Sequence, residues 1–160
     1  MISHIYSKEA EEDYWVLKHI VAVFLEEKEK AKKNAHNYLN KVGIGEKWDS
    51  YPSELSGGQQ QRASIARALC MEPSALLFDE PTSALDPELE QEVIKVIKDL
   101  AREGRTMIIV THDMGLAADV SDHIIFLHMG LIEEEGSPNS LFKSPKSERL
   151  QKFLSSTRAA

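Results

Sequence analysis

Two stretches of the sequence combine residue types that suit phosphate chemistry. The first, LSGGQQQR over residues 55–62, reads as a loop that becomes a helix: Ser56 is a good N-cap, and Gln59 can complete a capping box. The start of such a helix presents free backbone N–H groups and the positive end of the helix dipole, and Gly57 and Gly58 let a ligand approach the backbone. This stretch therefore favours an anion site, most often a phosphate site.

The second stretch is an apolar run at residues 75–78 followed by Asp79 and Glu80. The run predicts a buried strand that delivers two carboxylates at its carboxyl end, where one can bind Mg²⁺ and the other can act on a water molecule. Each stretch also has an ordinary explanation, a capped surface helix for the first and a pair of solvated acids for the second. Their occurrence together, in this order, favours the functional interpretation of both stretches over the ordinary ones.

The order of these motifs resembles that of the ATP-binding subunits of ABC transporters. LSGGQQQR is similar to their signature motif, and LLFDEP at residues 76–81 to their Walker B strand with its following glutamate. SALD at residues 83–86 resembles the D-loop, and THD at residues 111–113 resembles the loop that carries the switch histidine. The resemblance runs from about Ala31 to about Leu154, and FLHMGLIEEEG at residues 126–136 points to the subunits that energise uptake of polar and basic amino acids.

The resemblance implies a role for each matched residue. Asp79 would hold Mg²⁺ through water, Glu80 would polarise the attacking water, and His112 would contact the γ-phosphate of ATP. Asp86 would couple the two sites of a dimer, while Ser56 and Gly58 would contact nucleotide bound by the opposite subunit. The implied nucleotide-binding set is Ser56, Gly57, Gly58, Gln59 and Asp86. Arg62 and Arg67 are expected to form ion pairs around the signature helix, and Arg62 could assist the phosphate region.

One motif of that family has no match in these 160 residues. The Walker A loop needs Gly-x-x-x-x-Gly-Lys-Ser/Thr, because its backbone cradles the phosphates and its lysine reaches the terminal ones. None of the 8 glycines begins this pattern, and GIGEK at residues 43–47 comes nearest with the wrong spacing. The family's Q-loop glutamine and adenine-stacking aromatic also have no counterpart. Because the lysine-bearing loop supplies most of the phosphate positioning, we expect that the isolated chain neither binds ATP tightly nor hydrolyses it.

The succession of strand, helix, strand, helix and strand predicts an α/β fold with a mostly parallel sheet flanked by helices. By resemblance this is a partial P-loop NTPase fold that lacks the Walker A strand and loop. The strand at residues 106–110 is a continuous apolar run, which is typical of a strand buried on both faces. In the resembling fold the Walker A strand lies beside it, so we expect a gap or an exposed edge that invites pairing with another chain.

Three segments are expected along the chain: a poorly matched segment at 1–30, a helical signature subdomain at 31–74, and an α/β core with C-terminal helices at 75–160. Caps and apolar spacing set the other predicted elements. These are a helix at 26–42 ended by Gly43, a helix opened by Asp86 and Pro87 and ended by Gly104, a helix at 115–120, strands at 123–127 and 131–133 joined by a turn at 129–130, and short helices at 140–142 and 147–154.

Composition narrows the partners and the compartment. The formal net charge of −7 argues against a nucleic-acid partner, where a basic face would be expected. The lone Cys70 lies on the apolar face of the signature helix, which predicts a buried thiol in a reducing compartment. The most apolar run, residues 14–25, carries Lys18 and is too short to span a bilayer. No spacing among the other histidines suggests a metal site.

Two kinds of function remain open. The first is a truncated ATP-binding subunit of an importer of polar amino acids, using ATP and Mg²⁺, inactive alone, and held at the inner face of the cell membrane by permease subunits. The second is a non-catalytic module that completes the ATP site of another ABC ATPase subunit, or that has a structural or regulatory role. An upstream reading frame encoding a Walker A loop would favour the first.

Overall fold

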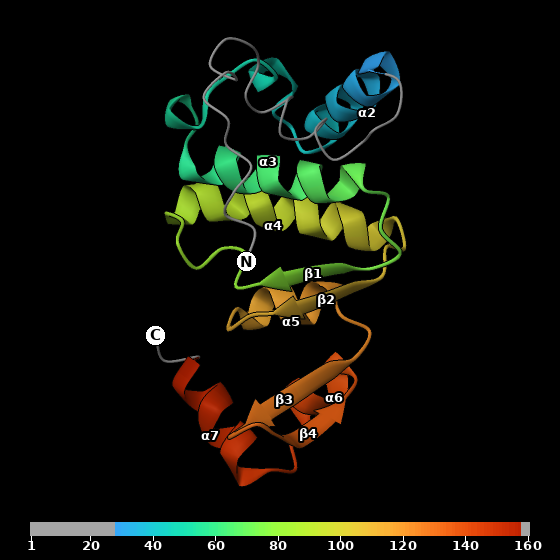
Figure 1. The fold of residues 1–160 in the computed structure, drawn as a ribbon. Helices are drawn as coiled ribbons and strands as arrows, with labels where there is room; N and C mark the ends of the chain where they lie inside the picture. The colour runs from blue at the N-terminus through green and yellow to red at the C-terminus, as the bar shows by residue number, and fades with distance from the viewer. Residues whose placement is uncertain (1–27, 158–160) are drawn as a thin grey trace. The chain divides into compact units, whose positions relative to one another are not determined.

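The computed structural model describes residues 28–157 of the chain (Figure 1). The expected segment 1–30, with its apolar run at 14–25, therefore lies almost entirely outside the described residues. Helices and strands alternate through the middle of the described chain, whereas helices follow one another at both of its ends. In order they are α2 Lys28–Lys41, the 3-10 turns η1 Gly45–Lys47 and η2 Pro52–Glu54, α3 Gly57–Cys70, β1 Leu76–Asp79, α4 Pro87–Arg102, β2 Met107–Val110, α5 Met114–Val120, β3 Ile124–His128, β4 Leu131–Gly136, α6 Pro138–Lys143 and α7 Glu148–Thr157.

Internal contacts divide the chain into two compact units. The first unit contains the described residues up to Leu76 together with Thr82–Val96, and so holds α2, α3 and the first part of α4. The second unit contains Leu77–Pro81 and the chain from Ile97 onward, and so holds most of β1, the end of α4 and all later elements. The candidate site residues are therefore distributed over both units.

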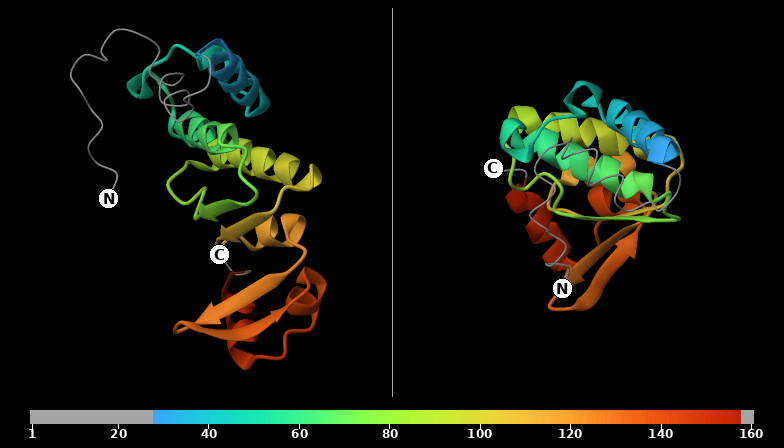
Figure 2. Two further views of the ribbon diagram at one scale, coloured as in Figure 1. Left: turned by 45° about the vertical axis from the view of Figure 1, so that its right-hand side comes forward. Right: turned by 45° about the horizontal axis from the view of Figure 1, so that its top comes forward.

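The first unit is built from helices, which Figure 2 draws as coiled ribbons. Helix α2 buries Ala31, Ala35 and Leu39, as its helical spacing predicts. The helix ends at Lys41, and Gly43, whose φ of 73° suits glycine, follows its last turn. The N–H of Gly43 donates to the Asn40 carbonyl oxygen, and that of Ile44 donates to the Leu39 carbonyl oxygen. These two bonds form a Schellman motif, which confirms the predicted C-cap.

The second unit contains two separate two-stranded sheets among its described residues. Strands β1 and β2 pair and run in the same direction, as Figure 1 shows. Strands β3 and β4 form an antiparallel hairpin across Met129 and Gly130, with a register irregularity between Phe126 and Leu127. The predicted hairpin and the predicted α/β fold are both confirmed, and the described strands do not join into one sheet.

The burial of β2 differs from the sequence expectation. Residues 106–110 were predicted to be buried on both faces, but Ile108 and Val110 are exposed while Met107 and Ile109 are half-buried. Leu77 of β1 is exposed in the same way. The prediction was wrong because burial on both faces needs a covering element on each side, and none of the described segments covers this one.

Elsewhere the buried side chains agree with the apolar spacing. Cys70, the last residue of α3, is buried. Its burial, with the nearby charge of Glu72, raises the pKa of the thiol to about 12. In the second unit, Leu141, Leu150 and Leu154 of α6 and α7 form a core against the β3–β4 hairpin. Among the described residues, no helix combines the length and the apolar character that crossing a bilayer requires.

Candidate functional site

The start of α3 has the cap that the sequence predicts. The Ser56 hydroxyl accepts a hydrogen bond from the Gln59 N–H at 3.2 Å, and the Gln59 side-chain oxygen accepts one from the Ser56 N–H at 3.0 Å. Ser56 has extended backbone angles, φ −64° and ψ 162°, so the chain turns into the helix at this residue. The reciprocal bonds form a capping box that holds the signature loop in one conformation.

The two glycines of the loop have different environments. Gly58 is buried, and a Cβ atom at this position would lie 3.0 Å from the Leu89 Cβ of α4. Gly57 is exposed, with the nearest side-chain atom, on Leu85, 3.2 Å from where its Cβ would be. Gly58 is thus explained by close packing of α3 on the first part of α4, and the exposed Gly57 keeps the predicted freedom for a ligand to approach its backbone.

Two side chains of α3 fasten the loop to its surroundings. The Gln60 amide donates to the carbonyl oxygens of Pro52 and Leu55, at 3.0 and 3.1 Å. The Arg62 guanidinium donates to Glu92 at 2.8 Å and to the carbonyl oxygens at the end of α2. The predicted ion pair of Arg62 is therefore confirmed and links α2, α3 and α4. Arg67 instead lies 3.5 Å from the Ser64 hydroxyl.

The strand β1 carries Asp79 and Glu80 to its carboxyl end. The Glu80 N–H donates to the Val110 carbonyl of β2 at 2.9 Å, which extends the pairing of the two strands by one residue. Glu80 has a φ of 45°, in the left-handed region that side chains other than glycine rarely occupy. The backbone there turns sharply, and His112 follows only two residues after Val110. The two side chains therefore leave neighbouring strand ends.

Glu80 and His112 contact each other directly. The His112 Nδ1 lies 2.7 Å from the Glu80 Oε2, with 70% of the histidine side chain and 36% of the glutamate side chain exposed. With its proton on Nδ1, the imidazole donates to the carboxylate, which fixes the plane of the ring. In the imidazolium form Nε2 also donates, so the ring can join this carboxylate to an anion on its other side.

Asp113 stabilises the turn after His112, and the sequence analysis did not predict this role. Its carboxylate accepts hydrogen bonds from the N–H groups of Gly115 and Leu116, at 2.8 and 3.0 Å, and caps α5. Its own N–H donates to the Thr111 hydroxyl at 3.0 Å. The signal was present, because an aspartate immediately before a helical run is a favoured N-cap. This cap fixes the loop that carries His112.

The predicted metal ligand Asp79 is exposed at the end of β1. Among the described residues, no group of three or more histidine, cysteine, aspartate and glutamate side chains is arranged to hold a metal ion. One or two carboxylates suit Mg²⁺ that keeps water molecules and phosphate oxygens as its remaining ligands, which is its usual coordination beside nucleotides. Asp79 therefore fits an ion that arrives with a phosphate ligand, and the described side chains do not form an all-protein cage.

The remaining predicted residue, Asp86, directly precedes α4, and its carbonyl oxygen accepts the Glu90 N–H at 2.9 Å. It belongs to the first unit with Ser56, Gly57, Gly58 and Gln59, whereas Asp79, Glu80 and His112 belong to the second. The other described histidines have separate surroundings: His36 contacts the Trp48 ring, His123 lies 3.2 Å from Glu135, and His128 lies 3.4 Å from Arg149.

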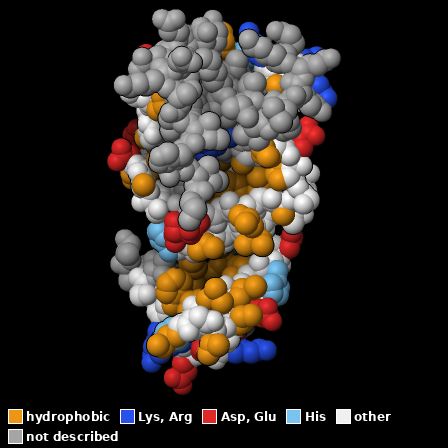
Figure 3. Space-filling model, in the orientation of Figure 1, with side chains coloured by type: hydrophobic (Ala, Val, Ile, Leu, Met, Phe, Trp, Pro, Cys, Tyr) orange, Lys and Arg blue, Asp and Glu red, His pale blue; other side chains and the backbone are white. Residues whose placement is uncertain are grey.

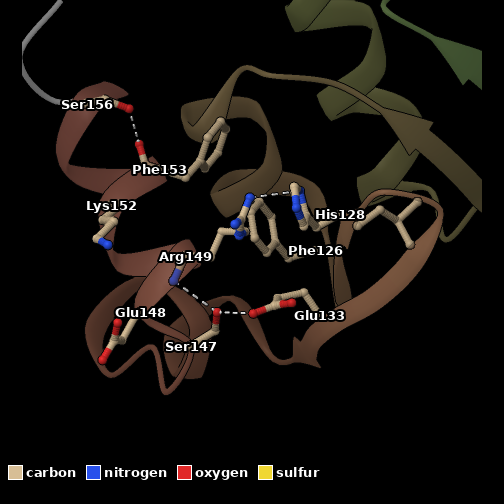
Figure 4. A pocket seen from close by; sticks show the side chains of 10 residues that line it. Phe126, His128, Glu133, Ser147, Glu148, Arg149, Lys152, Phe153 and Ser156 are labelled. Atoms are coloured by element: carbon tan, nitrogen blue, oxygen red, sulfur yellow. Dashed lines mark hydrogen bonds between the residues drawn. The ribbon is translucent and has the colours of Figure 1, made fainter.

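A cavity of about 780 Å³ lies in the second unit, between the β3–β4 hairpin and α7 (Figure 4). Phe126 and Phe153 line it, as do Glu133, Arg149 and Lys152. Figure 4 shows Ser147 between Glu133 and the start of α7, with its hydroxyl donating to the Glu133 carboxylate at 2.6 Å. None of the predicted site residues lines this cavity, so the candidate chemistry lies outside it.

Comparison with known proteins supports the interpretation of these motifs. The sequence profile of the family described as ABC transporter matches residues 3–83. The chain is 64% identical over 121 residues to the histidine transport ATP-binding protein HisP of Pseudomonas aeruginosa, covering 75% of this chain and 48% of that protein. It is 62% identical over 128 residues to the histidine/lysine/arginine/ornithine transport ATP-binding protein HisP of Escherichia coli K12, covering 79% of this chain and 50% of that protein. It thus spans about half the length of these relatives.

Solved structures show the same fold. An ATP-binding cassette in a dimeric post-hydrolysis state, bound to ADP and phosphate, matches with a TM-score of 0.62 and 34% identity, over 77% of this chain and 54% of that chain. A second cassette, in its ADP conformation, has a TM-score of 0.73 over 92% of this chain and 65% of that one; its 20% identity supports the fold alone. The ordered motifs, the family profile and these structures agree, and the chain belongs to the ABC transporter family.

Proposed function

We propose that this chain is part of the ATP-binding subunit of an ABC transporter that imports polar amino acids. Support comes from its relatives, whose names give histidine, lysine, arginine, ornithine and glutamine as their transported molecules. In this proposal the subunit works with a second ATPase subunit and with permease subunits, at the cytoplasmic face of the membrane. The particular amino acid would be selected by the permease and its binding protein.

The observation that carries the proposal is the contact between Glu80 and His112 at the ends of two paired strands. Glu80 is fixed by its backbone bond to Val110, and His112 by the Asp113 cap that follows it. In the proposed reaction Glu80 polarises a water molecule, and His112 contacts the γ-phosphate while remaining hydrogen-bonded to Glu80. Such positioned groups are what phosphoryl transfer requires, because its catalysis rests on positioning and charge stabilisation.

Two further roles belong to the proposal. Asp79 would hold Mg²⁺ through water, and the ion, when bound, neutralises charge on the phosphate oxygens. Ser56 and Gly58, at the capped start of α3, would act on nucleotide held by the opposite subunit, and Asp86 would couple the two sites. The capping box makes the signature loop a preformed surface for that contact, because its conformation does not depend on the partner.

Isolated, the chain is proposed to be inactive, since the sequence contains no Walker A pattern. The experiment is calorimetric titration of the purified chain with ATP and Mg²⁺, with the Glu80→Gln variant as control. We expect no detectable heat of binding from either protein. Tight binding would contradict the proposal, because it would require a phosphate cradle in some other segment.

A second candidate is a non-catalytic module that completes the ATP site of another, complete subunit. The preformed signature loop favours it, because that loop needs no Walker A residues of its own chain to keep its shape. Mixing the chain with intact Escherichia coli HisP separates the two candidates. A rise in ATP hydrolysis that is lost in Ser56→Ala and kept in Glu80→Gln would support the module; dependence on Glu80 would support catalysis by this chain.

A further inference from the structure

The cavity between the β3–β4 hairpin and α7 has no role in the proposed ATP chemistry. It lies within the second unit, and its volume of about 780 Å³ falls in the range of ~300–1,000 Å³ that is typical of small-molecule sites. Figure 3 shows basic and acidic side chains beside hydrophobic ones over this part of the chain. The lining includes side chains of three kinds: the rings of Phe126 and Phe153, the cations Arg149 and Lys152, and the carboxylate of Glu133.

The two phenylalanine rings form a fixed aromatic wall. Their centroids are 5.4 Å apart and their planes are inclined at 37°. Both rings pack against the buried core of α6 and α7, and both are half-buried. Each ring therefore has one side against the core and still lines the cavity with the rest of its surface. Such a wall suits a flat apolar group laid against it.

The cations of α7 line the cavity without a carboxylate partner. Arg149, Lys152 and Phe153 follow one another at intervals that place them on one face of the helix. Figure 4 shows the Arg149 side chain extending from α7 to the hairpin, where its Nη1 lies 3.4 Å from the His128 Nδ1. Among the residues that the structure describes, neither Arg149 nor Lys152 forms an ion pair. The guanidinium can therefore offer two parallel hydrogen bonds to a carboxylate that enters the cavity.

Glu133 brings a negative charge close to the start of α7. The Ser147 hydroxyl donates to its carboxylate at 2.6 Å and accepts the Arg149 N–H at 3.2 Å. An ionised carboxylate has further acceptor sites, so Glu133 can also bind a cationic group. Glu148 lines the cavity as well, so two carboxylates accompany the two cations. This balance disfavours a polyanion such as a polyphosphate, because like charges would meet, and favours a ligand with one group of each sign.

We propose that this cavity binds a free α-amino acid with an aromatic side chain. Its carboxylate pairs with Arg149, its ammonium group pairs with Glu133, and its ring lies against Phe126 and Phe153. Lys152 adds positive charge that attracts the carboxylate. The inference stands apart from the proposed ATP hydrolysis, because none of the residues proposed for that reaction lines the cavity.

The test is titration of the full ¹⁵N-labelled chain with L-phenylalanine, followed by NMR. Amide signals of the β3–β4 hairpin and α7 should shift to saturation, with a Kd on the order of 1 mM or lower. Three analogues each lack one recognised group: 3-phenylpropionate lacks the ammonium group, phenethylamine lacks the carboxylate, and L-alanine lacks the ring. Each should bind roughly tenfold or more weakly, because it leaves one part of the cavity without its partner.

Charge-removing variants identify which group each side chain recognises. Arg149→Gln should weaken phenylalanine binding by roughly tenfold and leave phenethylamine binding unchanged, since that analogue has no carboxylate. Glu133→Gln should also weaken phenylalanine binding, but it should not weaken binding of 3-phenylpropionate. Arg102→Gln is the matched control, because Arg102 is exposed, pairs with Asp99 in α4 and does not line the cavity.

Circular dichroism of each variant checks its fold, and the exchange of analogue preference between the two variants is an effect that general unfolding would not produce. Absence of a saturable shift with the unmodified chain would overturn the inference. Binding of 3-phenylpropionate as tight as that of phenylalanine would also overturn it, by assigning the cavity to simple carboxylates. Glu80→Gln should bind phenylalanine normally, so this site can be present even where the proposed ATP hydrolysis fails.

Discussion

The signature helix and the strands of the second unit differ in how far their apolar side chains are buried. Helix α3 buries Ile65, Ala66 and Leu69, and its first turn is closed by a complete capping box. Strands β1 to β3 are equally apolar in sequence but leave alternate side chains in contact with water. The helix has its neighbours, α2 and α4, within the same chain, whereas one face of the strands has none among the described residues.

The difference teaches that apolar character and burial are separate properties. A helix with one apolar stripe needs only one layer of neighbours to bury that stripe, and here the neighbours lie nearby in the sequence. A strand that is apolar at every position needs two layers. Substitutions of the same kind in the two regions should therefore have very different effects on stability.

The largest difference is expected for leucine truncation. Leu69→Ala should lower the free energy of unfolding by about 2–5 kcal/mol, because Leu69 is 1% exposed and its removal leaves a cavity in the core. Leu127→Ala, at the exposed strand position, should change it by less than about 0.5 kcal/mol. Urea unfolding followed by circular dichroism measures both. Equal losses would show that Leu127 is buried in solution, by self-association or by another segment, and would break the comparison.

A smaller effect is expected at the helix caps. Ser56→Ala should cost about 1 kcal/mol of stability, because it removes the acceptor for the Gln59 N–H. Ser137→Ala is the counterpart in the second unit, where the hydroxyl accepts the Ser140 N–H at 3.2 Å at the start of α6.

Ser56→Asp should retain most of the stability, since aspartate is an equally good N-cap. Thermal unfolding of the three variants ranks them. If Ser56→Ala were as stable as the unmodified chain, the capping box would not hold the signature loop, and the argument for a preformed loop would fail.

The smallest effect concerns Glu134 and pH. Its carboxylate accepts hydrogen bonds from the N–H groups of Ser147 and Lys146, which lowers its pKa below the usual 4.5. Because the folded pKa is the lower one, the stabilisation is present above about pH 4.5 and is lost as the pH falls through the folded pKa.

Glu134→Gln should therefore be slightly less stable than the unmodified chain at pH 7, and the difference should shrink as the pH falls below about 4.5. Glu46→Gln removes another exposed carboxylate and serves as control. Urea unfolding at a series of pH values gives both curves. A constant difference across the range would mean that the charge of Glu134 does not hold β4 to the start of α7.

Local chemistry was sufficient to predict most elements. Gly43, Gly104 and the pair Asp86-Pro87 predict helix ends that the structure places within two residues of the same positions. The motifs also placed Glu80 and His112 at the ends of predicted strands. Such features depend on a few neighbouring residues, and the backbone rules that govern them do not need the rest of the fold.

The parts that could not be predicted depend on distant segments. The exposure of Ile108 depends on what covers β2, which the residues of β2 do not encode. The contact between Glu80 and His112 requires two strands, separated by all of α4, to pair in one register. The hydrogen bond from the Ser147 N–H to the Glu134 carboxylate joins β4 to the residue just before α7, and no local spacing in the sequence predicts it. The predicted roles of Asp79 and Asp86 remain predictions.

The left-handed backbone of Glu80 has a consequence for how this position can change. A side chain in that conformation costs about 1–2 kcal/mol relative to glycine, which adopts it freely. Glu80→Gly would relax the backbone and at the same time remove the carboxylate that contacts His112. At this position, therefore, the residue that best suits the fold and the residue that suits the proposed chemistry are different. A substitution chosen for thermal tolerance alone would therefore replace the glutamate, whereas one chosen to preserve the proposed chemistry would keep it.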